Sequence, residues 1–177
     1  SFRDFLAQSN SYFPELAAEL KEFGGIDIEY EPGAGLLFLY FNEEEKQFGQ
    51  LIVDSLPDES RPQILTASEA QEIEPQLTDQ LLGAARLVDE HQVNPMWLAE
   101  GFKRAAINLG AKFRHETKAA SLTRVGDKIV GVQTGEEKFS CDTVVNAAGA
   151  WAGTLAETAE LRLPIFPVRG QIVLTQS

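Results

Sequence analysis

The sequence Val144-Val145-Asn146-Ala147-Ala148-Gly149-Ala150-Trp151-Ala152-Gly153 decides the fold class that we expect. It begins as an apolar strand and continues into a series of small residues. Small side chains allow another backbone or a bound ligand to come close. Tight packing between a strand and the following helix explains the pattern by itself, and a ligand-binding turn is the alternative.

The first 25 residues show the spacing of an amphipathic helix. Gly24 and Gly25 follow the last apolar position and supply the positive φ that a helix end prefers. Pro14 is expected to kink this helix or to begin its second half. The apolar positions are Phe2, Phe5, Leu6, Phe13, Leu16, Leu20 and Phe23.

Two strands are predicted next, over Ile26–Tyr30 and Leu36–Phe41. Pro32, Gly33 and Gly35 lie between them, which is the usual chemistry of a hairpin connection. We therefore expect these two strands to pair with each other.

Three further helices are predicted from their capping residues. The caps are Asn42 with Glu45, Thr66 with Glu69, and Asn94 with Pro95. The predicted ends are Ser55, Pro75 and Gly110. Between and after these helices the pattern changes to strands, over Ala84–Val88, Lys112–Arg114, Ala119–Arg124, Lys128–Gln133, Phe139 and Thr143–Asn146. Such an order predicts a mixed α/β chain in which helices cover one face of a sheet.

The composition excludes several classes of partner. The net charge is −12, from 27 acidic and 15 basic residues, and no cluster of basic residues interrupts the negative field. Nucleic acid and anionic membrane surfaces are therefore not expected partners. The longest apolar run, Gly33–Phe41, is far shorter than the roughly 20 residues of a membrane span. Cys141 is the single cysteine, so no internal disulfide forms, and a reducing compartment such as the cytoplasm is expected.

Several stretches together carry a family resemblance. They are His91-Gln92-Val93-Asn94-Pro95 at the start of a helix, Gly110-Ala111 before a strand, Val144–Trp151, and Pro167-Val168-Arg169-Gly170-Gln171. In order and spacing, the chain from about Tyr30 onward resembles the FAD-dependent amino-acid oxidase superfamily, which includes glycine oxidase, sarcosine oxidase and D-amino-acid oxidase.

The resemblance implies two domains that exchange segments along the chain. Residues 1–25 and 91–163 would belong to a Rossmann-like flavin-binding domain. Residues 26–90 and 164–177 would belong to a substrate domain built on an antiparallel sheet. The fold class implied is therefore α/β (mixed α+β), with part of each domain present.

The resemblance also implies where FAD is contacted. Ala119 matches the position whose backbone faces the adenine end, although the family usually has a bulkier aliphatic residue there. The small-residue turn would contribute Ala147, Ala148, Gly149 and Trp151. Catalytic residues stay unassigned, because the arginine that pairs with the substrate carboxylate in the family belongs to a later segment.

One element of a flavin site is absent from the sequence. The GxGxxG fingerprint that holds a dinucleotide does not occur. Gly33-Ala34-Gly35 supplies two glycines only, and an apolar strand follows it in place of a helix. We therefore expect an internal piece of a longer enzyme, cut at both ends, that neither retains FAD nor turns over by itself.

Other candidate residues favour structural roles. Asp89, Glu90 and His91 point to alternate sides of an extended chain, so no metal site is expected. His115 is expected at a strand edge and Arg169 in a structural ion pair or in solvent, with a substrate carboxylate as the alternative partner. Cys141 is expected to be an inert, partly buried thiol. Trp97 and Trp151 are expected to be core or interface residues.

The parent enzyme is thus expected to oxidise the C–N bond of a small amine or amino acid, with hydride transfer to the flavin and an imine as product. The alternative is a non-catalytic domain that acts by protein contact. An exposed apolar stripe with Phe2, Phe5 and Phe13 would favour a homodimer or self-association.

Overall fold

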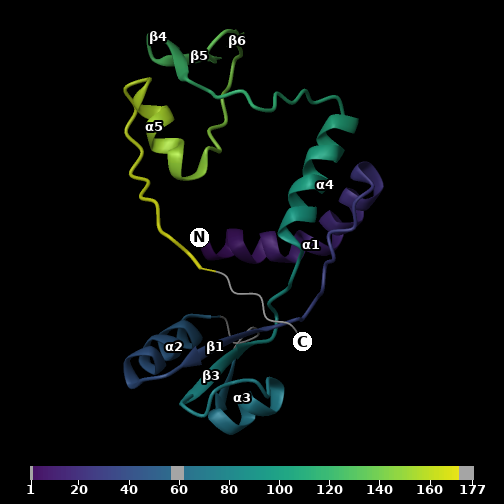
Figure 1. Cartoon of the computed structure of the whole chain (residues 1–177), viewed down its shortest axis with the longest axis vertical. Coiled ribbons are helices and arrows are strands. Elements are labelled where there is room, and N and C mark those ends of the chain that lie inside the picture. The colour runs from purple at the N-terminus through teal and green to yellow at the C-terminus, as the bar shows by residue number, and fades with distance from the viewer. Residues whose placement is uncertain (1, 57–61, 172–177) are drawn as a thin grey trace. The chain divides into compact units, whose positions relative to one another are not determined.

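The computed structural model describes residues 2–56 and 62–171, and the side chains from residue 4 onward within those ranges. The chain forms two compact units, residues 1–112 and 113–177. Both contain helices and antiparallel strands (Figure 1), which confirms the mixed α/β class. No helix in the described ranges is long and apolar enough to cross a membrane.

In the first unit, helices α1 (Phe2–Gly24) and α4 (Pro95–Asn108) pack against each other. Their shared core consists of Leu20, Ile26, Ile28 and Ala105. A Cβ at Gly24 would lie 2.8 Å from the carbonyl oxygen of Gly101, so glycine at this position permits the close approach of the two helices. Pro14 lies inside α1, and the helix changes direction along its length (Figure 1), as expected where a proline interrupts the hydrogen-bond ladder.

The predicted hairpin after α1 does not form. Residues 26–30 are not a regular strand, and Glu29 has φ of +55°, which breaks the extended conformation. Glu31, which follows this segment, instead forms an isolated bridge with Gln92. Strand β1 (Leu36–Tyr40), which was predicted, pairs with β3 (Gly83–Leu87) and not with residues 26–30.

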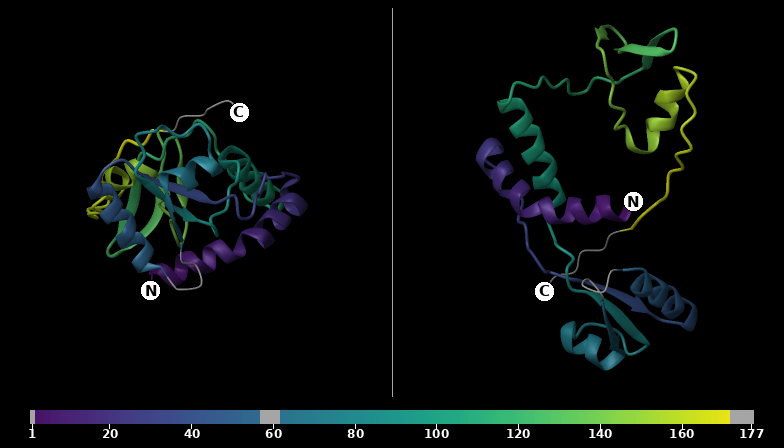
Figure 2. Two further views of the ribbon diagram at one scale, coloured as in Figure 1. Left: turned by 90° about the horizontal axis from the view of Figure 1, so that it is seen from below. Right: turned by 180° about the vertical axis from the view of Figure 1, so that it is seen from behind.

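The sheet of the first unit has the order β1-β3-β2, all antiparallel, with β2 at Gln63–Thr66. Helix α2 (Glu43–Ser55) packs on one face through Val53, which contacts Tyr40 and Ala85. Helix α3 (Ala67–Ile73) packs on the opposite face, and Figure 2 shows the strands between the two helices. The expectation that helices cover one face of a sheet is therefore wrong here, because alternate residues of β1 are apolar on both sides.

All three predicted helix caps are present. Asn42 Oδ1 accepts a hydrogen bond from the Glu45 N–H at 2.9 Å, and Thr66 forms a reciprocal capping box with Glu69. Asn94 Oδ1 accepts from the N–H groups of Met96 and Trp97. These side chains satisfy amide groups that a helix start otherwise leaves unpaired.

The second unit is a meander followed by a short helix. Strands β4 (Ser121–Val125), β5 (Lys128–Gln133) and β6 (Lys138–Ser140) are antiparallel and consecutive. Gly126 turns the chain between β4 and β5 with φ of +58°, as its place in the sequence predicted. The 3-10 helix η2 (Gly149–Trp151) leads into α5 (Ala152–Glu157).

Two predicted strands of this region are not strands. Residues 112–114 and 143–146 form no ladder with any part of the chain that the structure describes. Val145 is 86% exposed, although its sequence context predicts a buried strand. Sequence periodicity reports which residues favour an extended conformation, but a strand also needs a neighbour to pair with. The strand pattern over Gln171–Thr175 lies almost entirely outside the described residues.

Candidate functional site

Asn146 holds the small-residue turn of the second unit in shape. Its side-chain Oδ1 accepts a hydrogen bond from the Ala148 N–H at 3.3 Å, and its Nδ2 donates to the carbonyl of Ala152 at 2.9 Å. One carboxamide therefore connects the extended segment before the turn to the first residue of α5. An asparagine side chain that pairs with nearby backbone groups is a common way to fix such a turn.

The residues within this turn leave their backbone accessible. Gly149 has φ of +54°, and apart from its two chain neighbours no described residue has an atom within 4 Å of where its Cβ would be. Ala147 is exposed and Ala148 is half-buried. Trp151 donates its N–H to the Ala148 carbonyl, yet 75% of the residue is exposed. Of the two expected roles, core or interface residue, the core role is therefore wrong, and the interface role stays a prediction.

Helix α5 is fixed to the strand meander by polar groups and small residues. Thr158 Oγ1 accepts from the Leu122 N–H at 2.9 Å. Arg124 donates to the Ala159 carbonyl at 3.1 Å and to Glu160 Oε2 at 3.2 Å. The alanines at the contact are buried, at positions 152, 156 and 159. The turn before α5 is thereby positioned relative to β4.

Ala119 lies in the exposed segment that leads into β4. The next residue, Ala120, donates its N–H to the Gln133 carbonyl and so extends the ladder. Neither backbone group of Ala119 is hydrogen-bonded to the part of the chain that the structure describes. All five candidate flavin-contacting residues thus belong to the second unit.

These residues fit a part of a flavin site. They offer backbone groups and small or flat side chains with open space beside Gly149, which suits a planar ring or a phosphate group. They do not form a phosphate-binding loop. Gly33-Ala34-Gly35 is not one either, because its two glycine N–H groups donate to His91 Nδ1 and to the Glu90 carbonyl, each at 3.0 Å.

Comparison with known proteins identifies the family. Residues 3–177 match the family described as DAO, FAD dependent oxidoreductase. The chain belongs to this family. It is 36% identical to hydrogen cyanide synthase subunit HcnC of Pseudomonas aeruginosa over 179 residues, which are 99% of this chain and 43% of that protein. It is 34% identical to the glycine oxidase of Geobacillus kaustophilus over 178 residues, which are 96% of this chain and 45% of that protein.

The fold agrees with the sequence comparison. The crystal structure of glycine oxidase from Geobacillus kaustophilus superposes with a TM-score of 0.76 and 32% identity, over 89% of this chain and 42% of that one. The family resemblance and the FAD dependence that it carries are therefore confirmed for the family. The chain spans less than half the length of these relatives.

The segment 91–95 connects the residues that follow α1 to the start of α4. Glu31 and Gln92 exchange two backbone hydrogen bonds, of 2.9 and 3.1 Å. His91 accepts the hydrogen bond from Gly33, and its ring meets that of Tyr30 edge-on with centroids 5.4 Å apart. Asn94 caps α4. Residues 91–95 therefore have a structural role in this chain, since they fix the segment after α1 and cap α4.

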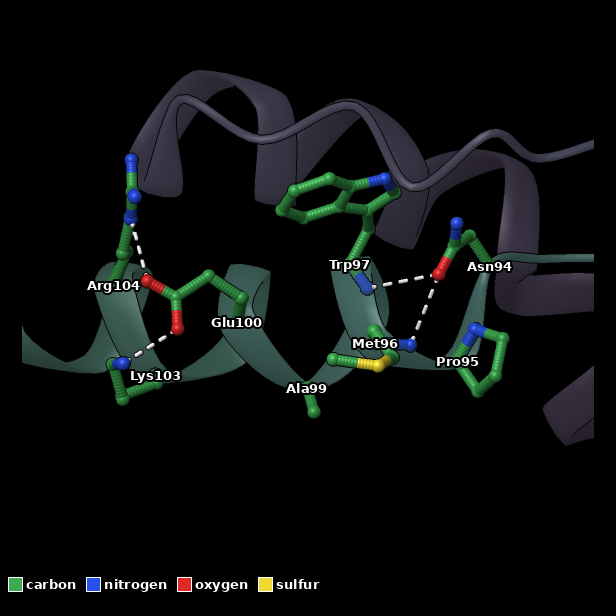
Figure 3. Close-up of a pocket in the computed structure, with 8 residues that line it drawn as sticks. All are labelled: Asn94, Pro95, Met96, Trp97, Ala99, Glu100, Lys103 and Arg104. Carbon is green, nitrogen blue, oxygen red and sulfur yellow. Dashed lines mark hydrogen bonds and ion pairs between the residues drawn. The ribbon is translucent and has the colours of Figure 1, made fainter.

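Two concave regions of the described surface do not contain the candidate flavin residues. One, of about 850 Å³, lies along α4 (Figure 3). There Glu100 accepts from Lys103 and Arg104, which lower the pKa of its carboxyl group. The second, of about 560 Å³, is lined by residues of β5 and β6 together with Cys141 and Asp142. Neither lining includes residue 119 or the turn at 147–151.

The remaining candidates have ordinary surroundings. Within the described ranges, no three His, Cys, Asp or Glu side chains are grouped so that they could hold a metal ion. His115 stacks on Phe113 with centroids 6.2 Å apart. Cys141 is half-buried, and Arg169 is exposed. Trp97 is 44% exposed.

Sequence reasoning missed Asn146, Arg124 and Thr158. Asn146 had a usable signal, because an asparagine between an apolar strand and three small residues is typical of a turn that a side chain closes. Arg124 and Thr158 had none. Their partners lie about 35 positions away, and local spacing does not report such a distance.

Proposed function

We propose that this chain is part of an FAD-dependent oxidoreductase of the glycine oxidase type, which oxidises the C–N bond of a small amine or amino acid. The family match over residues 3–177 carries the proposal. Glycine oxidases among the relatives and solved structures support the choice of substrate class.

The flavin would accept the hydride from the carbon next to the substrate nitrogen, and water would hydrolyse the resulting imine. In this proposal the chain's own residues bind and position. The free backbone groups of Ala119 would face the adenine end. The turn of Ala147, Ala148 and Gly149, held by Asn146, would bring its backbone against the cofactor without side-chain obstruction, and Trp151 would cover one side.

We also propose that the 177 residues alone do not turn over. The sequence contains no GxGxxG loop for the pyrophosphate. The five candidate residues, which would contact FAD through backbone groups or through the ring of Trp151, would hold the cofactor weakly. Ordering the cofactor costs free energy that few contacts offset.

A second candidate is a dehydrogenase of the same family that passes electrons to an acceptor other than oxygen. The relative with 36% identity is a subunit of hydrogen cyanide synthase, which supports action of the longer protein within an assembly. A third candidate, a non-catalytic domain that acts by protein contact or as a homodimer, is supported by exposed apolar residues such as Phe5 at 66%.

Two measurements test these proposals. The visible absorption spectrum of the purified chain, after incubation with FAD and removal of the excess, should show no retained flavin. The longer protein should retain it and oxidise glycine or sarcosine. Hydrogen peroxide formation would indicate an oxidase, and dye reduction without peroxide would indicate the second candidate. A longer protein that binds FAD but oxidises no amine or amino acid contradicts the substrate assignment.

A further inference from the structure

Arg86 lies on β3, the middle strand of the first unit's sheet. In register it faces Leu37 on β1 and Gln63 on β2, so the three side chains form one row across one face of the sheet. Helix α3 packs on that face over the next row, which contains Leu39, Ala84 and Leu65.

The position of the guanidinium group follows from Gly35. A Cβ at Gly35 would lie 3.9 Å from Arg86 Nε, so the arginine side chain extends over this glycine. Gly35 has φ of +76°, a conformation that other residues rarely adopt. The loop thus leaves a flat backbone surface beneath the arginine.

Arg86 differs from the other arginines that the structure describes. Arg104 pairs with Glu100, Arg114 with Glu137, and Arg124 with Asp127 and Glu160. Arg162 and Arg169 are exposed to water. Arg86 is half-buried, and no hydrogen bond or ion pair joins its side chain to the described residues, although acidic residues outnumber basic ones by 27 to 15 in the sequence.

A partly desolvated cation without a partner is unfavourable, and a bidentate anion offsets this cost. The planar fork of arginine matches a carboxylate, which lysine does not. The side chain of the exposed Gln63 beside it also forms no hydrogen bond within the described ranges, and its carboxamide can donate to the same ligand. Leu37 on the other side provides apolar contact.

We propose that Arg86, with Gln63 and Leu37 beside it, is a binding site for a small carboxylate that carries a short apolar part. A single negative charge fits better than a phosphate. The row contains one cation only, and the net charge of −12 repels a multiply charged anion more strongly. The site is independent of the proposed function, since it requires neither flavin nor turnover.

The test is an NMR titration of the ¹⁵N-labelled 177-residue chain. Sodium acetate is added at constant ionic strength, with sodium chloride as the reference salt, and the Nε–Hε signal of Arg86 is followed. The expected result is a saturable shift at Arg86 and at the Gln63 side-chain amide. A shift that is linear in acetate, or equal in chloride, overturns the proposal.

Variants separate binding from folding. Arg86→Lys keeps the charge and should weaken acetate binding by roughly ten-fold, because the loss of one hydrogen bond of a bidentate pair corresponds to about that factor. Arg162→Lys is the matched control and should leave the affinity unchanged. Gln63 amide shifts report binding in both variants, and circular dichroism reports whether each is folded. Equal affinity in Arg86→Lys and the unmodified chain contradicts a carboxylate held by the guanidinium fork.

The identity of the ligand's charged group is tested separately. Glycine and acetate should both saturate the site, whereas methylammonium chloride should not shift Arg86. A saturable shift with methylammonium overturns the assignment to a carboxylate. Failure of FAD binding or of amine oxidation in the longer protein leaves these results unaffected, so the two proposals fail independently.

Discussion

Asn94 Nδ2 donates a hydrogen bond of 2.8 Å to Glu29 Oε2, across 65 positions of the sequence. The same carboxamide caps α4 through its oxygen. Glu29 in turn has φ of +55°, and its N–H donates to Asp27 Oδ1 at 3.0 Å. The Asn94 side chain thus joins the start of α4 to Glu29, a residue in an unfavourable backbone conformation. Its bond to Glu29 fixes the carboxamide that caps the helix, and the helix start in turn holds Glu29 in place.

Replacement of Asn94 by alanine should lower the free energy of unfolding by about 1–2 kcal/mol, since two helix N–H groups lose their acceptor. Urea denaturation followed by circular dichroism measures the change. Asn94→Ser retains a capping oxygen and should cost less than Asn94→Ala. Equal stability of all three proteins would show that the cap contributes nothing to this fold.

Replacement of Tyr40 by phenylalanine should stabilise the folded protein. Tyr40 is 3% exposed, and its hydroxyl group has no hydrogen-bond partner in the described part of the chain. A buried hydroxyl without a partner costs free energy, and removal of the hydroxyl does not leave a cavity of any size. Tyr40→Phe should therefore raise the free energy of unfolding by up to about 1 kcal/mol. A clear decrease would reveal a partner for the hydroxyl group.

The same residue predicts a dependence on alkaline pH. Burial raises the pKa of Tyr40, so the folded protein holds the phenolic proton more strongly than the unfolded chain does. This contribution to stability is present below the pKa of an unfolded tyrosine, about 10, and is lost as the pH rises through the higher folded value. The stability advantage of Tyr40→Phe should therefore increase between about pH 9 and pH 11. A difference that is constant with pH contradicts the prediction.

Gly49 of α2 is expected to tolerate no side chain. A Cβ there would lie 2.3 Å from Tyr40 Cε1. Alanine is the better helix former by about 1 kcal/mol, but the overlap with a buried ring should cost more, so Gly49→Ala should destabilise by about 1–3 kcal/mol. Gly135→Ala is the control, because in the described part of the chain no atom beyond its two neighbours lies within 4 Å of its Cβ position. If Tyr40→Leu rescues Gly49→Ala in a double-mutant cycle, the clash is with the ring.

The sequence predicted elements whose information is local. Caps at Asn42, Thr66 and Asn94 each depend on residues two or three positions away, and all three are present. The strand expected over residues 26–30 failed, because a local hydrogen bond to Asp27 favours the positive φ at Glu29. No residue type in the segment 26–30 predicts the positive φ at Glu29.

Strand pairing is where sequence reasoning reached its limit. Strand β2 is short, and it was not predicted since its pairing with β3 connects residues about 20 positions apart. Residues 112–114 and 143–146 have strand composition but no ladder in the described ranges. The site follows the same rule. A turn at Gly149 was expected from its small neighbours, and its contact with FAD was predicted from the family resemblance and stays a prediction. The contacts that hold α5 in place required the folded structure.

Thr158 should be the most sensitive position of the second unit. Its hydroxyl accepts from the Leu122 N–H at 2.9 Å and donates to the Leu155 carbonyl at 2.7 Å, so it joins β4 to α5. Thr158→Val preserves shape and leaves a part-buried N–H without an acceptor, which costs about 1–3 kcal/mol. Hydrogen exchange should become faster at Leu122 and throughout α5 but unchanged in α4. Thr158→Ser keeps the hydroxyl group and should retain the slow exchange of the Leu122 amide. If the valine variant exchanges as slowly as the unmodified chain, α5 is held by its buried alanines alone.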